Sequence, residues 1–474
     1  MPKDLHSFLR QVQEMLPDEY VRVEREVDPE FELTGVLRKL QEANRYPSVL
    51  FEHVRGTRLP VIGNLLASRK RLALAFDTTD SGLTETYVKR QEARIDPLMV
   101  DDAPVHDVVI TGDDVDLTYI PNITHCEGDA GPYISSGVCI AKDADTGVRN
   151  AGIYRIQIAG KHKLRYYPGE YSHMEHLRKK REAREEPLEI AIVVGHHPAV
   201  YMASQYRGPL DVDEMAVAGG LMGEPLRMTK CKTVDVEVPA DAELVIEGRV
   251  PPHVREFEGP FGEFTWYLGP GVDNPIIEVT AITHRRDAIY QDMFNAHPEH
   301  NLTGLIGREA GIYRAVKNTT PTLKALTLPF SGCCRHAVYI AIKKEYDGLG
   351  RNCAMAALAA DPFLKLAIIV DDDIDVFDET QVMWAVATRV QADRDVFVIP
   401  DAYVCELDPS AYDVADRSKR GYLNAKWAID ATKPVGLPFQ ERSDVPEQAW
   451  KNLNLDDYIV TGSRPRIEEL AARR

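Results

Sequence analysis

Six short segments in the middle of the chain decide the fold: SSGVCIAKD (135–143), AGIYRIQIAG (151–160), LEIAIVVG (188–195), KTVDVEVP (232–239), AELVIEGRV (242–250) and PIIEVTAITH (275–284). Each is rich in aliphatic and β-branched residues and is bounded by Gly, Pro or Asp, which is typical of β-strands. Two helical segments interrupt the series, HMEHLRKKREAREE (173–186) and DVDEMAVAGGLMG (211–223). This density of short strands predicts a barrel or a sandwich for residues 106–300.

Helix and strand alternate on both sides of this centre. In residues 1–105, apolar residues at helical spacing precede the strand VLFEHV (49–54), which predicts a small α/β domain. After residue 301, strands at 337–343, 364–370 and 395–400 alternate with helices at 301–318, 353–360 and 379–390. This pattern predicts a doubly wound α/β domain over 301–474, with a charged terminal helix, IEELAARR (467–474). Three domains also suit 474 residues at roughly 150 residues per domain.

The composition excludes some functions. A formal charge of −18 argues against nucleic acid, although a local arginine can still attract an acidic substrate. The seven cysteines form no C-x-x-C pair, which indicates reduced thiols. No apolar run reaches the ~18 residues that cross a bilayer, and the amphipathic segment at the start lacks the apolar centre of a signal peptide. We therefore expect a cytoplasmic protein without a membrane partner.

The segment AGIYRIQIAG places a charge among apolar residues. Side chains alternate along a strand, so Arg155 shares a face with Ile153 and Gln157. An arginine there either faces an anion or lies on an exposed edge strand. In a continuous strand, Asn150 would face the side opposite to Arg155. It can share a site with Arg155 only if it lies at the entrance of the strand or if a bulge separates the two residues.

Two carboxylates flank a tight turn in the segment E-G-P-F-G-E. Glu258 and Glu263 stand at its two ends, and the glycines between them permit conformations that bulkier residues cannot adopt. Proximity and burial would separate the pKa values of the pair and let one carboxyl hold a proton. A solvated acidic turn is the alternative.

Asn150, His173 and Glu214 would together suit a hard divalent cation such as Mn²⁺ or Mg²⁺. Their spacing does not show that they meet. Glu214 can instead serve the dipole of the apolar helix that it begins, and His173 can be a helix cap.

The order of the motifs along the chain resembles that of the UbiD family of prenylated-flavin decarboxylases. The resemblance rests on DAGPYISSGV, NAGIYRIQ, ASQ-x7-DEMAVAGGLMGEP, EVPADAELVIEG, E-G-P-F-G-E, IVDDDID and WAVATR. It implies a central split β-barrel that binds the flavin, between a small N-terminal domain and a C-terminal domain that pairs subunits in a homodimer or larger homo-oligomer. It also implies a partner, the flavin prenyltransferase that supplies prenylated FMN.

The resemblance also assigns site residues. The catalytic set is Arg155, Glu258 and Glu263, and a Mn²⁺-type ion that ties down the cofactor phosphate falls to Asn150, His173 and Glu214. The residues matched to flavin contacts are Asn150, Ile153, Tyr154, Arg155, Ser172 and His173, with Lys365 matched to a phosphate contact and Ser204 to a K⁺ site near the cofactor. Ser172 departs from the Gln of ferulate-type relatives, and Glu263 from the Asp of ubiquinone-pathway enzymes.

The expected reaction is the reversible, non-oxidative decarboxylation of an aromatic, heteroaromatic or α,β-unsaturated acid. Glu263 would donate the proton that replaces CO₂, with Arg155 and Glu258 assisting. One alternative is a flavin-binding oxidoreductase with a split barrel. The other is a flavin-free metal decarboxylase, which would need a His-x-His metal motif on a strand, and this sequence has none. Candidate substrate contacts by family position are Met293, His297, Arg335, His336 and Trp427, whose polar members favour a hydroxylated or heteroaromatic ring.

Overall fold

The computed structural model describes residues 3–170, 172–411 and 423–458. The chain forms two compact units, Met1–Thr432 and Lys433–Arg474. The expected domain boundaries near residues 105 and 300 stay predictions, because the first unit is not divided at either of them.

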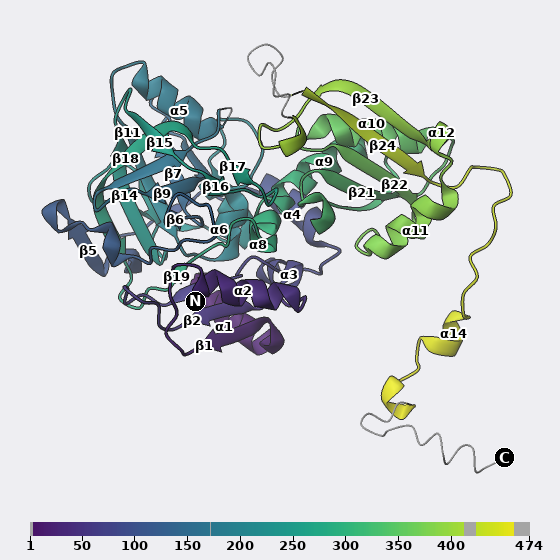
Figure 1. The fold of residues 1–474 in the computed structure, drawn as a ribbon, viewed down its shortest axis with the longest axis horizontal. Helices are drawn as coiled ribbons and strands as arrows, with labels where there is room; N and C mark the ends of the chain where they lie inside the picture. Colours follow the sequence, from purple (N-terminus) through teal and green to yellow (C-terminus); the bar gives the residue numbers. More distant parts are fainter. Residues whose placement is uncertain (1–2, 171, 412–422, 459–474) are drawn as a thin grey trace. The chain divides into compact units, whose positions relative to one another are not determined.

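The N-terminal region is a small sheet covered by helices (Figure 1). Its helices are α1 (Leu5–Met15), α2 (Glu32–Glu42), α3 (Arg69–Ala75) and α4 (Leu83–Glu92). The sheet has the order β1 (Tyr20–Val23), β2 (Ser48–Phe51), β3 (Val61–Gly63) and β19 (Tyr290–Gln291). The last strand comes from far along the chain and pairs with β3 in parallel. The amphipathic helix expected at the start is confirmed as α1, whose apolar face is buried.

The central region is a curled antiparallel sheet of ten strands. Its strands are β5 (Val108–Thr111), β6 (Tyr133–Ile134), β7 (Val138–Lys142), β8 (Arg149–Ile153), β9 (Arg155–Ile158), β10 (Lys163–Tyr167), β11 (Leu188–Val194), β14 (Leu244–Val250), β15 (Arg255–Glu258) and β18 (Val272–His284). The helical segments expected within it are confirmed as α5 (His173–Glu182) and α7 (Glu214–Met222), and a third helix, α6 (Pro198–Ala203), lies between them. Smaller sheets join β16 (Phe261–Gly262) to β17 (Leu268–Gly269), and β4 (Leu98–Met99) to β12 (Arg227–Lys230) and β13 (Glu237–Pro239).

The strand expected at 232–239 is largely wrong. In KTVDVEVP only Glu237–Pro239 is a strand, and it pairs with β12 outside the large sheet. The backbone amides of Lys232 and Thr233 donate instead to the carboxylate of Glu247, at 2.8 and 2.6 Å. A side chain therefore satisfies backbone groups that the sequence pattern assigned to a strand ladder.

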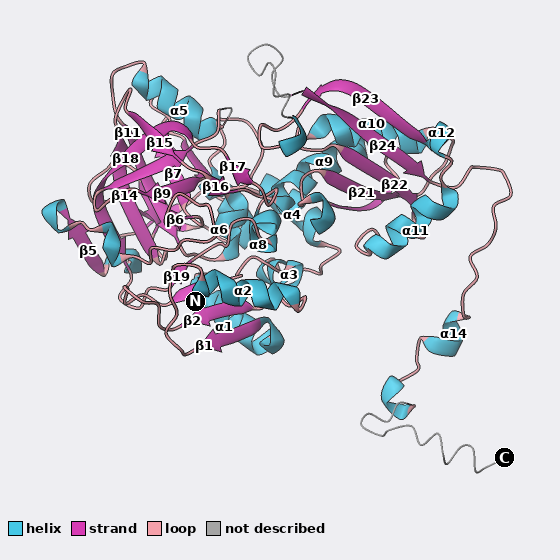
Figure 2. Cartoon of the chain, viewed as in Figure 1, coloured by secondary structure: helices cyan, strands magenta, loops and turns pink. Residues whose placement is uncertain are grey.

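The C-terminal region is an α/β layer structure, as expected (Figure 2). Its sheet has the order β20 (Leu323–Thr327), β21 (Ala337–Ile342), β22 (Leu366–Asp371), β24 (Leu423–Ala431) and β23 (Val396–Tyr403). The helices are α8 (Pro298–Thr303), α9 (Leu305–Thr319), α10 (Leu349–Ala360), α11 (Glu379–Arg389) and α12 (Ala392–Asp395). Alternate residues of β21 enter different cores: Val338 and Ile340 pack with α9 and α10, whereas Tyr339 and Ala341 pack with α11.

Among its described residues, the second unit contains one short α-helix, α14 (Glu447–Trp450), and a turn of 3₁₀ helix at Leu455–Asp457. The charged helix expected at 467–474 lies outside the described residues. All seven cysteines are free. Within the described ranges, no helix combines the length and apolarity needed to cross a bilayer.

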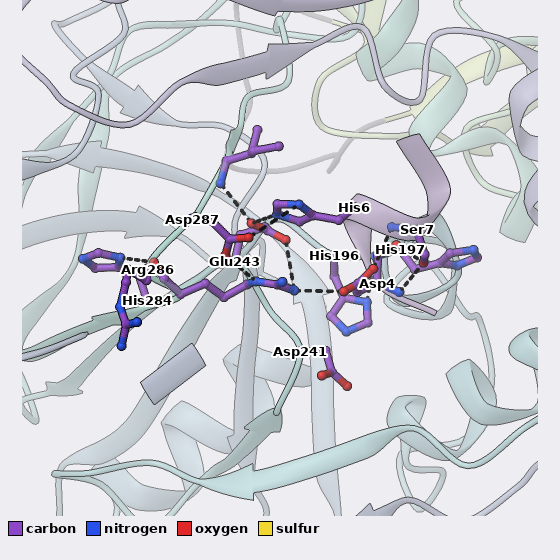
Figure 3. Close-up of polar contacts among 12 residues, drawn as sticks. Asp4, His6, Ser7, His196, His197, Asp241, Glu243, His284, Arg286 and Asp287 are labelled. Atoms are coloured by element: carbon purple, nitrogen blue, oxygen red, sulfur yellow. Dashed lines mark hydrogen bonds and ion pairs between the residues drawn. The ribbon is translucent and has the colours of Figure 1, made fainter. Parts of the chain in front are cut away.

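A buried ion cluster fastens α1 to the central sheet (Figure 3). Asp4, the N-cap of α1, accepts from Arg285 Nη1 at 2.9 Å, and His6 Nε2 lies 3.1 Å from Glu243 Oε2. Glu243 is fully buried and also accepts from the backbone amide of Ile289 at 2.9 Å. The first helix is thereby held to the loops that begin β14 and follow β18.

Candidate active site

Arg155 lies where the chain changes partners in the large sheet. Strand β8 pairs with β7, whereas β9 pairs with β6 and β10, and Tyr154 separates the two. This break removes the parity conflict between Asn150 and Arg155 that a continuous strand would impose. The Arg155 side chain is buried, and its guanidinium lies over the ring of Tyr167, 4.5 Å from the ring centre.

The structure brings Arg155, Glu258 and Glu263 together. Arg155 Nη2 and Nε donate to Glu258 Oε2 at 2.9 and 3.2 Å, and Nη1 donates to Glu263 Oε1 at 2.6 Å. Two further donors reach Glu258: Asn274 Nδ2 at 2.8 Å and the Tyr133 hydroxyl at 2.9 Å. Glu258 is therefore surrounded by hydrogen-bond donors from Arg155, Asn274 and Tyr133.

Glu263 has a different environment. Within the described ranges, its carboxyl accepts a side-chain hydrogen bond from Arg155 alone, and burial raises the pKa of this carboxyl against the opposing charge of Arg155. Gly269 packs directly on this pair, because a Cβ there would lie 2.8 Å from Glu263 Cγ and 3.1 Å from Arg155 Nη1. Glu263 therefore holds a proton more readily than a free glutamate does.

Two adjoining cavities meet at Glu263. The smaller, of about 200 Å³, contains Arg155, Tyr167 and Phe261 in its wall. The larger, of about 520 Å³, runs past Ser204 and Arg335 to Asn150, His173 and Glu214. Five residues line both: Ile153, Tyr154, Glu263, His300 and Leu407. The acid–arginine cluster and the expected metal ligands therefore open into one continuous site.

The side chains of Asn150, His173 and Glu214 suit a divalent cation. Asn150 Nδ2 lies 3.1 Å from Glu214 Oε1 and 3.5 Å from His173 Nδ1. Asn150 Oδ1 is buried without a hydrogen-bond partner among the described residues. Burial raises the pKa of Glu214 to about 8. An orphaned amide oxygen, an imidazole and a desolvated carboxylate are ligands that Mn²⁺ or Mg²⁺ would satisfy.

The remaining expected site residues divide into two groups. Ser172 and Ser204 line the larger cavity; Ser172 also caps α5, and the Ser204 hydroxyl donates to Tyr201 O at 2.7 Å. Lys365 instead pairs with Asp408 at 3.0 Å and is not among the residues that line the two cavities. Its assignment to a phosphate stays a prediction.

Of the expected substrate contacts, Met293 and Arg335 line the cavities. His336 lies behind Phe264, with ring centres 5.4 Å apart, and His297 is a buried cap of α8. Trp427 is 39% exposed on β24 and does not belong to either lining.

Several residues of the site carry no strong signal in the sequence. Tyr133 approaches Glu258 from a strand distant in the chain and Asn274 from the next long strand, β18. His300 and Leu407 come from the C-terminal region. Tyr133 lies within DAGPYISSGV, so the family motif could have indicated it. His300 is only three residues from His297 in HPEH, a spacing that a helix turn brings to one side.

Comparison with known proteins covers nearly the whole chain. Models of the N-terminal, Rift-related and C-terminal domains of 3-octaprenyl-4-hydroxybenzoate carboxy-lyase match residues 16–91, 98–298 and 301–431. Anhydromevalonate phosphate decarboxylase of Methanothermobacter thermautotrophicus is 37% identical over 90% of this chain and 97% of its own.

Solved structures agree with this result. The UbiD-class enzyme HmfF from Pelotomaculum thermopropionicum, in complex with FMN, is 40% identical, with a TM-score of 0.90 over 96% of this chain and 100% of its own. The 3,4-dihydroxybenzoic acid decarboxylase AroY of Klebsiella pneumoniae is 28% identical, with a TM-score of 0.87 over 97% of this chain and 100% of its own.

Proposed function

Because this chain belongs to the UbiD family of carboxy-lyases and is a decarboxylase of that family, we propose that it acts on an aromatic, heteroaromatic or α,β-unsaturated carboxylic acid with prenylated FMN. The reaction is non-oxidative and runs in reverse at high CO₂. The observation that carries the proposal is the unequal pair Glu258 and Glu263 around one buried arginine.

Glu263 is the proton donor in this proposal. Burial raises the pKa of its carboxyl, and it opens into both cavities, so a protonated Glu263 can reach the carbon that CO₂ leaves. After the transfer, its carboxylate is stabilised by Arg155 Nη1 at 2.6 Å.

Arg155 and Glu258 position the substrate in this proposal. The donors Tyr133 and Asn274 fix the Glu258 carboxylate, and Glu258 in turn fixes two nitrogens of Arg155. Arg155 then presents its remaining edge to the cavity, where it can orient the substrate carboxylate.

The larger cavity suits a flavin phosphate at one end. Asn150, His173 and Glu214 would hold Mn²⁺ or Mg²⁺, which neutralises the phosphate, and Ser204 would contribute to a K⁺ site beside it. When bound, the prenylated flavin supplies the electron sink that decarboxylation requires and that no side chain provides. The relative HmfF is described in complex with FMN and, in an evolved dimeric form, with prFMN. We also expect a homodimer or larger homo-oligomer formed through residues 301–474, working in the cytoplasm.

Expression with and without a flavin prenyltransferase tests the proposal. Protein made with the prenyltransferase should carry a modified flavin in its visible spectrum and release CO₂ from a panel of aromatic and conjugated acids. Protein made without it should be inert and gain activity on reconstitution. Full activity with plain FMN, or oxidation of a nicotinamide cofactor without CO₂ release, would favour the oxidoreductase alternative.

A further inference from the structure

Arg335 is an exception among the buried arginines of this protein. In the described part of the chain, six arginines are at least nine-tenths buried. Five of them form an ion pair with a carboxylate: Arg71 with Glu19, Arg155 with Glu258, Arg178 with Glu175, Arg308 with Asp361 and Arg389 with Asp371. Arg335 is 7% exposed, and no carboxylate of the described residues lies within ion-pair distance of its guanidinium.

The guanidinium of Arg335 is held in place by packing. It lies over the ring of Phe264, 4.3 Å from the ring centre. On another side it approaches Gly304 so closely that a Cβ at that position would lie 2.3 Å from Nη2. Its Nη1 is buried without a hydrogen-bond partner among the described residues. The Arg335 guanidinium is therefore held in place by apolar and backbone contacts rather than by hydrogen-bond acceptors.

The buried, unpaired guanidinium of Arg335 destabilises the fold unless an anion binds to it. An uncompensated buried charge costs several kcal/mol, and for that reason buried arginines are normally paired. Burial and the nearby Arg308 and Arg207 lower the pKa of Arg335 to about 9, which leaves it charged at neutral pH. Such unfavourable placements are typical of binding sites, where a ligand supplies the missing group.

The larger cavity contains both Arg335 and Glu263 in its wall, together with the half-buried His300. Burial raises the pKa of Glu263, and the charges of Arg155 and Arg335 oppose this effect, so both arginines act on the same carboxyl. Arg155 already forms ion pairs with two carboxylates, whereas the guanidinium of Arg335 forms none among the described residues.

We propose that Arg335 binds a second anionic group of the substrate, a carboxylate or phosphate remote from the carboxylate that leaves, and so selects dianionic acids. This inference rests on the proposed decarboxylase function. The cofactor phosphate is the other candidate anion, but the larger cavity already offers it Asn150, His173 and Glu214, which suit a bridging cation.

Binding of unreacted ligands to the FMN-loaded full chain tests the proposal. The probes are benzoate, terephthalate and 4-phosphonobenzoate, which differ in the group opposite the shared carboxylate. Titration calorimetry should show the two dianions binding about 10- to 100-fold more tightly than benzoate, the range for hydrogen bonds to charged groups. Arg335→Met should remove this preference and leave benzoate affinity unchanged.

Two further variants separate binding from folding. Gly304→Ala should weaken the dianions and not benzoate, because its methyl group displaces the Arg335 fork. Arg351→Met is the matched control, since Arg351 lies over Phe397 at 4.8 Å on the exposed side of α10 and should change nothing. Because Arg335→Met removes an unpaired buried charge, its melting temperature should equal or exceed that of the wild type.

Three results would overturn the proposal. They are equal affinity of the wild type for benzoate and both dianions, a lower melting temperature of Arg335→Met with equal loss of all three ligands, and weaker FMN binding by Arg335→Met, which would assign the cofactor phosphate to Arg335. None of these readouts depends on turnover. A protein that binds dianions through Arg335 and releases no CO₂ would therefore refute the proposed reaction alone.

Discussion

Tyr133 donates its hydroxyl to Glu258 Oε1 at 2.9 Å, and no neutral side chain of the described residues donates to the Glu263 carboxyl. The two carboxyls flank one short turn, yet strand β6 supplies a partner to only one of them. The division of labour that we propose for them rests on this inequality in donors and on the burial that raises the pKa of Glu263.

Glu263→Gln should lose turnover about 10²–10⁴-fold, the usual effect of removing a positioned general acid. Glutamine keeps the shape and the contact with Arg155 but has no proton to give. Flavin content should be normal, and exchange of the product's ring or vinyl hydrogen with solvent deuterium, followed by NMR, should fall with turnover. Near-normal exchange in a fully loaded variant would transfer the role to Glu258 or to water.

The rate should fall as pH rises through the pKa of Glu263. Burial raises that pKa, so the protonated form persists above the range of a free glutamate and is lost on the alkaline side. The positive charge of Arg335 opposes the rise in the pKa of Glu263. In Arg335→Met, the alkaline fall of the rate should therefore move to higher pH. A pH profile of kcat for both proteins measures the shift, and an unmoved limb would argue that Glu263 does not control it.

Glu214→Ala should strip the metal and weaken flavin retention together, because the proposed ion would join the protein to the phosphate. Elemental analysis and the visible spectrum give the two readouts. Glu237→Gln is a suitable control, since Glu237 forms its ion pairs with Lys142 and Arg149 and does not line either cavity. A melting curve must accompany the test, and stoichiometric metal in Glu214→Ala would show that the ligand assignment is wrong.

Gly269→Ala should damage catalysis more than folding. The new methyl group would lie 2.8 Å from Glu263 Cγ and 3.1 Å from Arg155 Nη1, so the ion pair must shift by several tenths of an ångström. We expect turnover to fall about tenfold or more, because small misplacements of catalytic groups are costly. Kinetics beside a melting curve distinguish this outcome from unfolding, and unchanged kcat would show that the pair tolerates the shift.

The contact of His6 with Glu243 should make stability depend on pH. The hydrogen bond to Glu243 raises the pKa of His6, while burial and Arg285 oppose it and Asp287 supports it. The folded protein therefore holds this proton more tightly than the unfolded chain, and the resulting stability is lost as pH rises through the folded pKa. Urea unfolding at about pH 6 and about pH 8 should show a smaller free energy at the higher pH, and His6→Gln should flatten the difference. If the free energy of unfolding of His6→Gln changes with pH as much as that of the wild type, the pH dependence comes from other groups.

The sequence predicted those features that depend on neighbouring residues. The apolar run of β11 and the helical spacing of α1 each determine an element without distant partners. Arg155 could be singled out because a charge in an alternating strand is conspicuous. Its partners could not all be identified this way, because Asn274 meets Glu258 only after β15 pairs with β18. Arg335 was a candidate by position alone, and its lack of a carboxylate partner is a property of the folded chain.

The parallel pairing of β19 with β3 has a consequence for the order in which this protein can be made. Tyr290 and Gln291 complete the edge of a sheet whose other strands are synthesised before residue 64. During translation, the N-terminal sheet must wait for more than 220 intervening residues with an open edge that another chain could pair with. A fragment ending near residue 105 would keep that edge open permanently, so the shortest stable N-terminal piece must contain the central sheet as well.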